Sequence, residues 1–99
     1  MIDYGWIITK EFDAVKSGEK SSVGTVGPSG ITEDVQARLQ KGEGTKFRLY
    51  DDDGELYAEG LQISDGGEDG EFAPLDDFGM PNWGCTEIKQ LLNGEWKTV

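Results

Sequence analysis

The feature that most restricts the fold is the dipeptide Asn93-Gly94, which separates two short runs of strand-forming residues. Both residue types tolerate positive φ, which the tight turn of a two-residue β-hairpin requires. Residues 86–92 and 95–99 are therefore predicted to pair as antiparallel strands. In the register that such a turn imposes, Leu91 faces Trp96 across the ladder.

The same kind of pattern recurs along the chain. Runs rich in aromatic and β-branched residues predict further strands at 4–12, 22–26, 45–50 and 55–63. Gly60 lies inside the last of these runs and predicts a β-bulge there. The turn between the last two runs is acidic and ends in Gly54, as a hairpin turn would.

One helix of about ten residues is predicted after Gly30. Thr32 is a suitable N-cap residue, and the acidic residues that follow it favour the positive end of a helix. Val35 and Leu39 lie four residues apart and would share one face. Residues 64–71 are predicted to be a loop, and residues 72–84, rich in glycine and proline, an ordered but irregular segment packed on the sheet. The chain is thus expected to be one α+β domain over 1–99, a mostly antiparallel sheet of five or six strands with one short helix.

The charge is concentrated in one segment. Of the 20 acidic residues, 12 lie between residues 49 and 88, which contain no lysine or arginine. We call residues 49–88 the acidic segment. The rest of the chain holds eight acids and all nine bases, so the net charge of −11 comes entirely from the acidic segment.

Two functions are compatible with the acidic segment. It can be a solvated face that keeps the protein dispersed, or a docking surface for a basic protein partner. The second interpretation predicts nine partner-binding residues: Asp51, Asp52, Asp53, Glu55, Glu68, Asp69, Glu71, Asp76 and Asp77. Twelve carboxylates match the charge on about 20 Å of duplex DNA, which carries one charge per about 1.7 Å.

Several other classes of function are disfavoured. The chain has no histidine, which removes the commonest general base and most zinc sites. Cys85 is the one cysteine and is expected to be a buried, inert thiol. We therefore expect no enzyme and no cofactor. The absence of a lysine and arginine cluster disfavours direct nucleic-acid binding. With no apolar run of membrane-spanning length and no signal peptide, the expected setting is the cytoplasm.

A calcium-binding loop over residues 65–76 is an alternative. Asp65, Asp69 and Asp76 fall at the first, fifth and twelfth positions of an EF-hand loop. Gly67 brings no ligand to the third position, and the flanking residues do not predict paired helices. The alternative is therefore a calcium loop of another type on a small β-rich protein.

Two stretches, FRLYDDDGELYAEG at 47–60 and APLDDFGMPNWGCTEI at 73–88, resemble a group of small, uncharacterised bacterial or phage-type acidic proteins. Together the two stretches cover about 30 residues. In composition the chain also resembles phage-encoded inhibitors of host defence, including anti-CRISPR proteins and other DNA mimics. That resemblance implies an inhibitor that occupies a basic or nucleic-acid-binding surface of its target.

Overall fold

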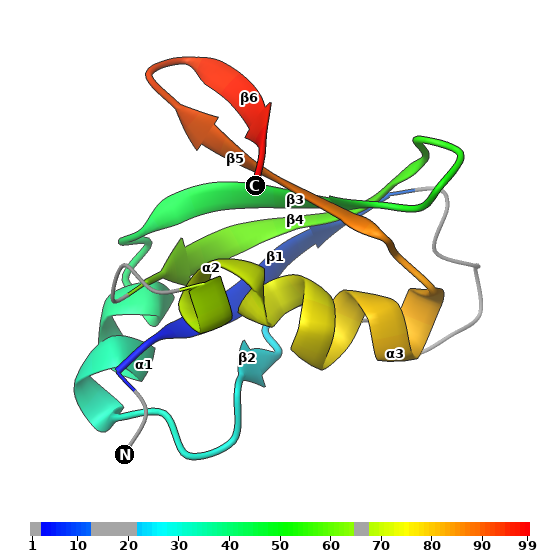
Figure 1. The fold of residues 1–99 in the computed structure, drawn as a ribbon. Helices are drawn as coiled ribbons and strands as arrows, with labels where there is room; N and C mark the ends of the chain where they lie inside the picture. Colours follow the sequence, from blue (N-terminus) through cyan, green and yellow to red (C-terminus); the bar gives the residue numbers. More distant parts are fainter. Residues whose placement is uncertain (1–2, 13–21, 65–67) are drawn as a thin grey trace.

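The computed structural model describes residues 3–12, 22–64 and 68–99, with only the backbone of Glu68 and Asp69. In these residues six strands form one antiparallel sheet, in the order β2-β1-β4-β3-β5-β6 (Figure 1). The strands are β1 (Gly5–Glu11), β2 (Val26–Gly27), β3 (Thr45–Tyr50), β4 (Leu56–Ile63), β5 (Glu87–Leu92) and β6 (Glu95–Thr98). The predicted α+β class, dominated by an antiparallel sheet, is confirmed.

The C-terminal hairpin has the predicted turn and register. Asn93 and Gly94 have φ of 54° and 81°, the left-handed conformation that the turn needs. Leu91 is paired with Trp96 across β5 and β6. In Figure 1 this hairpin forms the upper margin of the sheet, with β6 as the edge strand.

Helix α1 (Glu33–Gln40) lies where the sequence predicted it. The Thr32 hydroxyl accepts a hydrogen bond from the backbone N–H of Val35 at 3.2 Å, which caps the helix. Val35 and Leu39 are buried, and a Cβ placed on Gly5 of β1 would contact both of them. Helix α1 therefore packs against β1 at one end of the sheet.

A second helical segment corrects the prediction for residues 68–84. Helix α2 (Glu68–Pro74), the π-helical turn η1 (Leu75–Gly79) and helix α3 (Met80–Trp83) follow one another without a break. The expectation of a loop extending to residue 71 and of an irregular segment at 72–84 is wrong for these residues. The two prolines and three glycines at 70–84 predicted irregular structure, but the buried contacts of Leu75 and Gly79 hold a helix together.

Gln62 supplies the hydrogen bond that Pro74 removes from α2. In a regular helix the residue at position 74 would donate its N–H to the carbonyl of Gly70, and proline has no N–H. The side-chain Nε2 of Gln62, on β4, donates instead to the carbonyl oxygens of Gly70 and Glu71, at 3.2 and 3.1 Å. Gln62 is 1% exposed, so this contact fixes α2 onto the sheet from inside.

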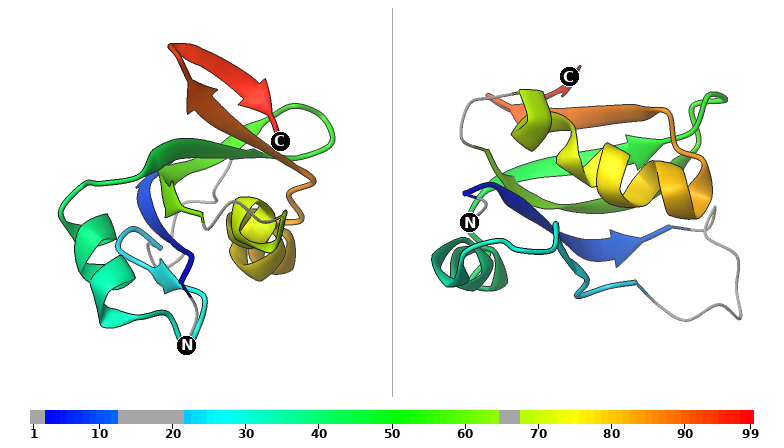
Figure 2. Two further views of the ribbon diagram at one scale, coloured as in Figure 1. Left: turned by 60° about the vertical axis from the view of Figure 1, so that its left-hand side comes forward. Right: turned by 60° about the horizontal axis from the view of Figure 1, so that its bottom comes forward.

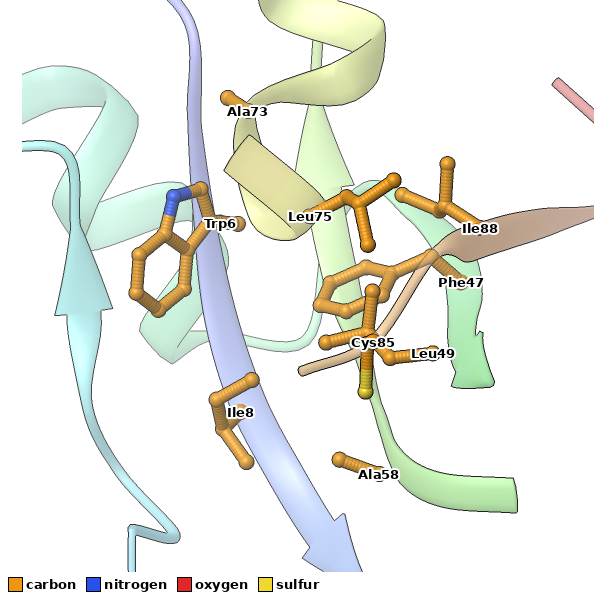
Figure 3. Close-up of a cluster of buried hydrophobic side chains, with 9 residues drawn as sticks. All are labelled: Trp6, Ile8, Phe47, Leu49, Ala58, Ala73, Leu75, Cys85 and Ile88. Atoms are coloured by element: carbon orange, nitrogen blue, oxygen red, sulfur yellow. The ribbon is translucent and has the colours of Figure 1, made fainter. Parts of the chain in front are cut away.

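The core lies between the sheet and the helical segment α2-η1-α3. Nine buried residues form one cluster (Figure 3): Trp6, Ile8, Phe47, Leu49, Ala58, Ala73, Leu75, Cys85 and Ile88. Because side chains alternate along a strand, Gly5 and Ile7 point to the opposite side of β1 from Trp6 and Ile8. Helix α1 lies on that opposite side, so the two helical elements flank β1 from different sides (Figure 2).

The bulge predicted at Gly60 is present beside it, on the neighbouring strand. The register of β1 and β4 shifts between Ile8 and Lys10, so the extra residue is Thr9. Gly60 itself is required for close approach, because a Cβ there would lie 2.1 Å from the carbonyl oxygen of Ile7. It would also lie 2.6 Å from the ring of Phe47. The glycine therefore lets the ring of Phe47 approach the backbone of β4 closely.

Among the described residues, no helix is long and apolar enough to cross a membrane.

Candidate acidic docking surface

The β3–β4 turn holds four of the predicted partner-binding residues in a fixed conformation. We call Asp51–Glu55 the acidic tip. The Asp51 carboxylate oxygen Oδ1 accepts hydrogen bonds from the backbone N–H groups of Asp53 and Glu55, each at 2.9 Å. Asp52, Asp53 and Glu55 are exposed. One aspartate is thus used to shape the turn, and the other three acids point their charge to solvent.

Tyr57 connects the acidic tip to the helical segment. Its hydroxyl lies close to the Asp51 carboxylate, and its ring stacks on Trp83 of α3 with centroids 6.0 Å apart. Burial, together with the negative charge of Asp51, raises the pKa of Tyr57. The end of the sheet that carries the acidic tip is therefore also the end at which α3 finishes (Figure 1).

The acidic tip also brings carboxylates close together. Oxygens of Asp51, Asp52 and Asp53 lie within 4.8 Å of one another. Hard cations such as calcium take oxygen ligands of this kind, usually six to eight of them. The Asp51 Oδ1 atom already accepts two backbone hydrogen bonds, which reduces what the cluster offers a cation.

The helical segment carries the other five predicted residues. Asp76 and Asp77 lie on η1 and are exposed, and Glu71 on α2 is half-buried. The indole Nε1–H of Trp6 donates to Oδ2 of Asp77 at 3.3 Å, so that this carboxylate is held against β1. Glu68 and Asp69 lie at the start of α2, at the end of the helical segment farther from α3 (Figure 1).

The residues of the calcium alternative do not all lie on a loop. Asp69 lies in α2 and Asp76 in η1, seven residues further along one continuous helical segment. A helix rises about 1.5 Å per residue, which separates their backbones by about 10 Å. Asp65 lies outside the described residues, so the calcium alternative stays a prediction.

The two bases that bound the acidic segment lie opposite each other across β3 and β5. Arg48 is paired with Lys89 in the ladder. The Arg48 guanidinium binds Glu59 at 2.9 Å and lies 4.2 Å from the ring centroid of Trp96. Lys89 lies 3.7 Å from a Glu87 carboxylate oxygen and 4.9 Å from the ring centroid of Tyr50. Both positive charges are therefore paired with glutamates of the sheet, Glu59 and Glu87.

The acidic tip and the exposed acids of η1 form no ion pair with any described residue. In residues 3–12, 22–64 and 68–99, the ion pairs involve the acids Glu43, Glu59 and Glu87. None of them includes Asp52, Asp53, Asp76 or Asp77. Within the described part of the chain, the negative charge of these four exposed carboxylates is therefore not compensated by an ion pair.

Two contacts of these acids have no signal in the sequence. Trp6 and Asp77 are 71 residues apart, and Tyr57, which lies close to Asp51, is the extra residue where the register of β3 and β4 shifts. Local patterns predict which segments form acidic turns, but they do not predict which aromatic side chains contact the acidic residues.

Comparison with known proteins identifies no relative. No family model matches the chain, and neither a curated protein nor a solved structure matches it.

Proposed function

We propose that this chain is an acidic protein-interaction module that occupies a basic, nucleic-acid-binding surface of a partner protein. It would do so as phage-encoded DNA mimics do when they inhibit host defence. The observation that supports this proposal most strongly is the uncompensated charge of Asp52, Asp53, Asp76 and Asp77 on backbone that is held in place.

Uncompensated charge on ordered backbone favours binding for two reasons. Like charges held together in a folded protein cost stability, and an approaching basic surface relieves that cost. Groups that are already ordered lose little conformational entropy when they bind. Asp51 orders the acidic tip through two backbone hydrogen bonds, and the indole of Trp6 holds Asp77.

The proposal is tested by capture and competition. Immobilised wild-type protein is expected to retain a basic protein from lysate at low salt. High salt should elute that protein, and so should an excess of short duplex DNA. The variant D52K/D53K/D76K/D77K should retain nothing that duplex DNA displaces. Its circular dichroism and melting curve show whether the fold is kept. Equal retention by wild type and variant would mean that the acidic segment is a solvated face with no docking role.

A further inference from the structure

Met80 is an exposed apolar side chain within the acidic segment. In the described part of the chain three large hydrophobic residues are exposed, namely Val23, Met80 and Leu92, and Met80 alone lies between residues 49 and 88. Its side chain is 51% exposed. A single exposed apolar residue is common on protein surfaces. The surroundings of Met80 distinguish it from the other two.

The π-helical turn places Met80 beside the exposed acid Asp76. The Met80 N–H donates to the carbonyl of Leu75, five residues earlier, so that a turn here takes more residues than in an α-helix. Residues four and five apart then lie on the same side, which puts Met80 next to Asp76 and puts Pro81 next to Asp76 and Asp77. All four of these side chains are exposed. We call Asp76, Asp77, Met80 and Pro81 the outer helix face.

Buried contacts on the other side of the helix fix the outer helix face. A Cβ on Gly79 would lie 3.0 Å from Leu49, so the helix backbone rests directly on the core. The ring of Phe78 packs against Trp6 of β1, with centroids 5.2 Å apart. The helix therefore cannot turn about its axis without losing these contacts, and the four exposed residues keep one orientation.

Pro81 interrupts the α-helical hydrogen-bond pattern directly after the wide turn. Pro81 has no N–H to donate to the carbonyl of Asp77, four residues earlier, so the α-helical pattern is interrupted there. The side-chain Nδ2 of Asn82 donates to the carbonyl of Phe78 at 2.8 Å, which satisfies the next acceptor. Single π-helical turns inside helices are frequent at functional sites.

We propose, on the basis of the function proposed above, that the outer helix face is where the basic partner docks. The partner would present a segment with an apolar side chain between two basic ones. Asp76 and Asp77 attract the basic groups, and Met80, which is flexible and polarisable, covers the apolar one. A small apolar centre with a polar rim is the usual anatomy of a protein interface. The outer helix face thus distinguishes a basic protein segment from a simple polycation.

Two synthetic peptides of equal positive charge test this assignment by titration into isotope-labelled protein. In one, serine separates the arginines, and in the other leucine takes the serine positions. Wild type should bind the leucine peptide more tightly, with shift changes centred on residues 76–81. Met80→Gln should reduce that preference about fourfold, the effect of losing about one buried methylene. The affinity for the serine peptide should not change.

Leu92→Gln is the matched control, because Leu92 is 39% exposed and lies outside the acidic segment. It should leave the preference for leucine intact. An unchanged preference in Met80→Gln, or shift changes confined to the acidic tip, would overturn the assignment to the outer helix face. If neither peptide binds while the capture experiment still yields a DNA-displaceable protein, the assignment fails and the proposed function stands. If the capture experiment also yields none, both fail.

Discussion

At the scale of single residues, the buried side chain of Gln62 shows how a helix that contains a proline is stabilised by a residue of the sheet. Gln62 lies near the end of β4, and nothing in its neighbours in the sequence predicts that it hydrogen-bonds to a helix. Its role follows from the fold, because only the packed structure places it beneath Gly70. Its other side-chain atom, Oε1, is buried and accepts no hydrogen bond from the described residues.

The role of Gln62 predicts a coupling with Pro74. Gln62→Met should lower the free energy of unfolding by about 1–3 kcal/mol, because it leaves buried carbonyl oxygens without a donor. In a Pro74→Ala background the alanine N–H can donate to Gly70, so the same substitution should cost about 1 kcal/mol less. Urea denaturation of the four proteins measures this difference. Additive effects would contradict the explanation.

Cys85 provides a second test at this scale. Burial, and secondarily the charge of Asp51, raises the pKa of the Cys85 thiol to about 11. In the native protein at pH 8 the thiol should react with a disulfide reagent far more slowly than in denaturant, because the thiolate is the reacting form. An equal rate in both states would show that the thiol is not buried.

The sign of the pH dependence follows from the same shift. The unfolded thiol loses its proton near pH 9, whereas the folded thiol keeps it up to about pH 11. The unfolded state therefore binds fewer protons in this window, and stability falls as pH rises through it. Cys85→Ala should make the fall between about pH 9 and 11 shallower in thermal melts.

At the scale of elements, local patterns predicted α1 and five of the strands but not the second helical segment. The strand predicted at 22–26 is wrong for residues 22–25, since β2 comprises Val26–Gly27. Hairpin turns and capped helices depend on residues close in sequence, such as Asn93-Gly94 and Thr32, and these patterns can be recognised without the fold. The segment at 68–83 depends instead on Gln62 and on the buried face of the sheet, which lie elsewhere in the chain. Its spacing of Leu75, Gly79 and Trp83 at intervals of four was the available signal.

The contribution of the C-terminal hairpin can be measured through its tryptophan. Trp96 is half-buried, lies outside the buried core cluster, and contacts Arg48. Trp96→Ala should therefore cost about 1–2 kcal/mol, the scale of a cation–π contact and partial burial. Phe47→Ala, in the core, should cost about 3–5 kcal/mol. Equal losses of stability in chemical denaturation would place Trp96 in the core.

At the scale of the whole molecule, the charge distribution was predictable and its geometry was not. The sequence alone shows that 12 of the 20 acidic residues lie in the acidic segment. Whether they share one element depends on topology, which places some on the acidic tip and others on a helix that the sequence did not predict. The pairing of Arg48 with Lys89 also required the sheet order.

Uncompensated charge predicts a dependence of stability on salt. The melting temperature should rise from about 0.02 M to about 0.5 M sodium chloride, because salt screens repulsion among the acids. The variant D52N/D53N/D76N/D77N should be more stable at low salt and less sensitive to salt. The control E33Q/D34N also removes negative charge, but it loses favourable interactions with the helix α1 dipole, worth about 0.3–1 kcal/mol each. A salt-independent melting temperature in wild type would argue against the charge model.

The most direct test of the docking function is a titration of the purified partner with this protein in the presence and absence of a saturating short DNA duplex. We expect the duplex to abolish binding of the wild-type protein, and we expect D52K/D53K/D76K/D77K not to bind in either condition. A complex that contains partner, duplex and wild-type protein together would contradict this expectation, as would full binding by the charge-reversed variant.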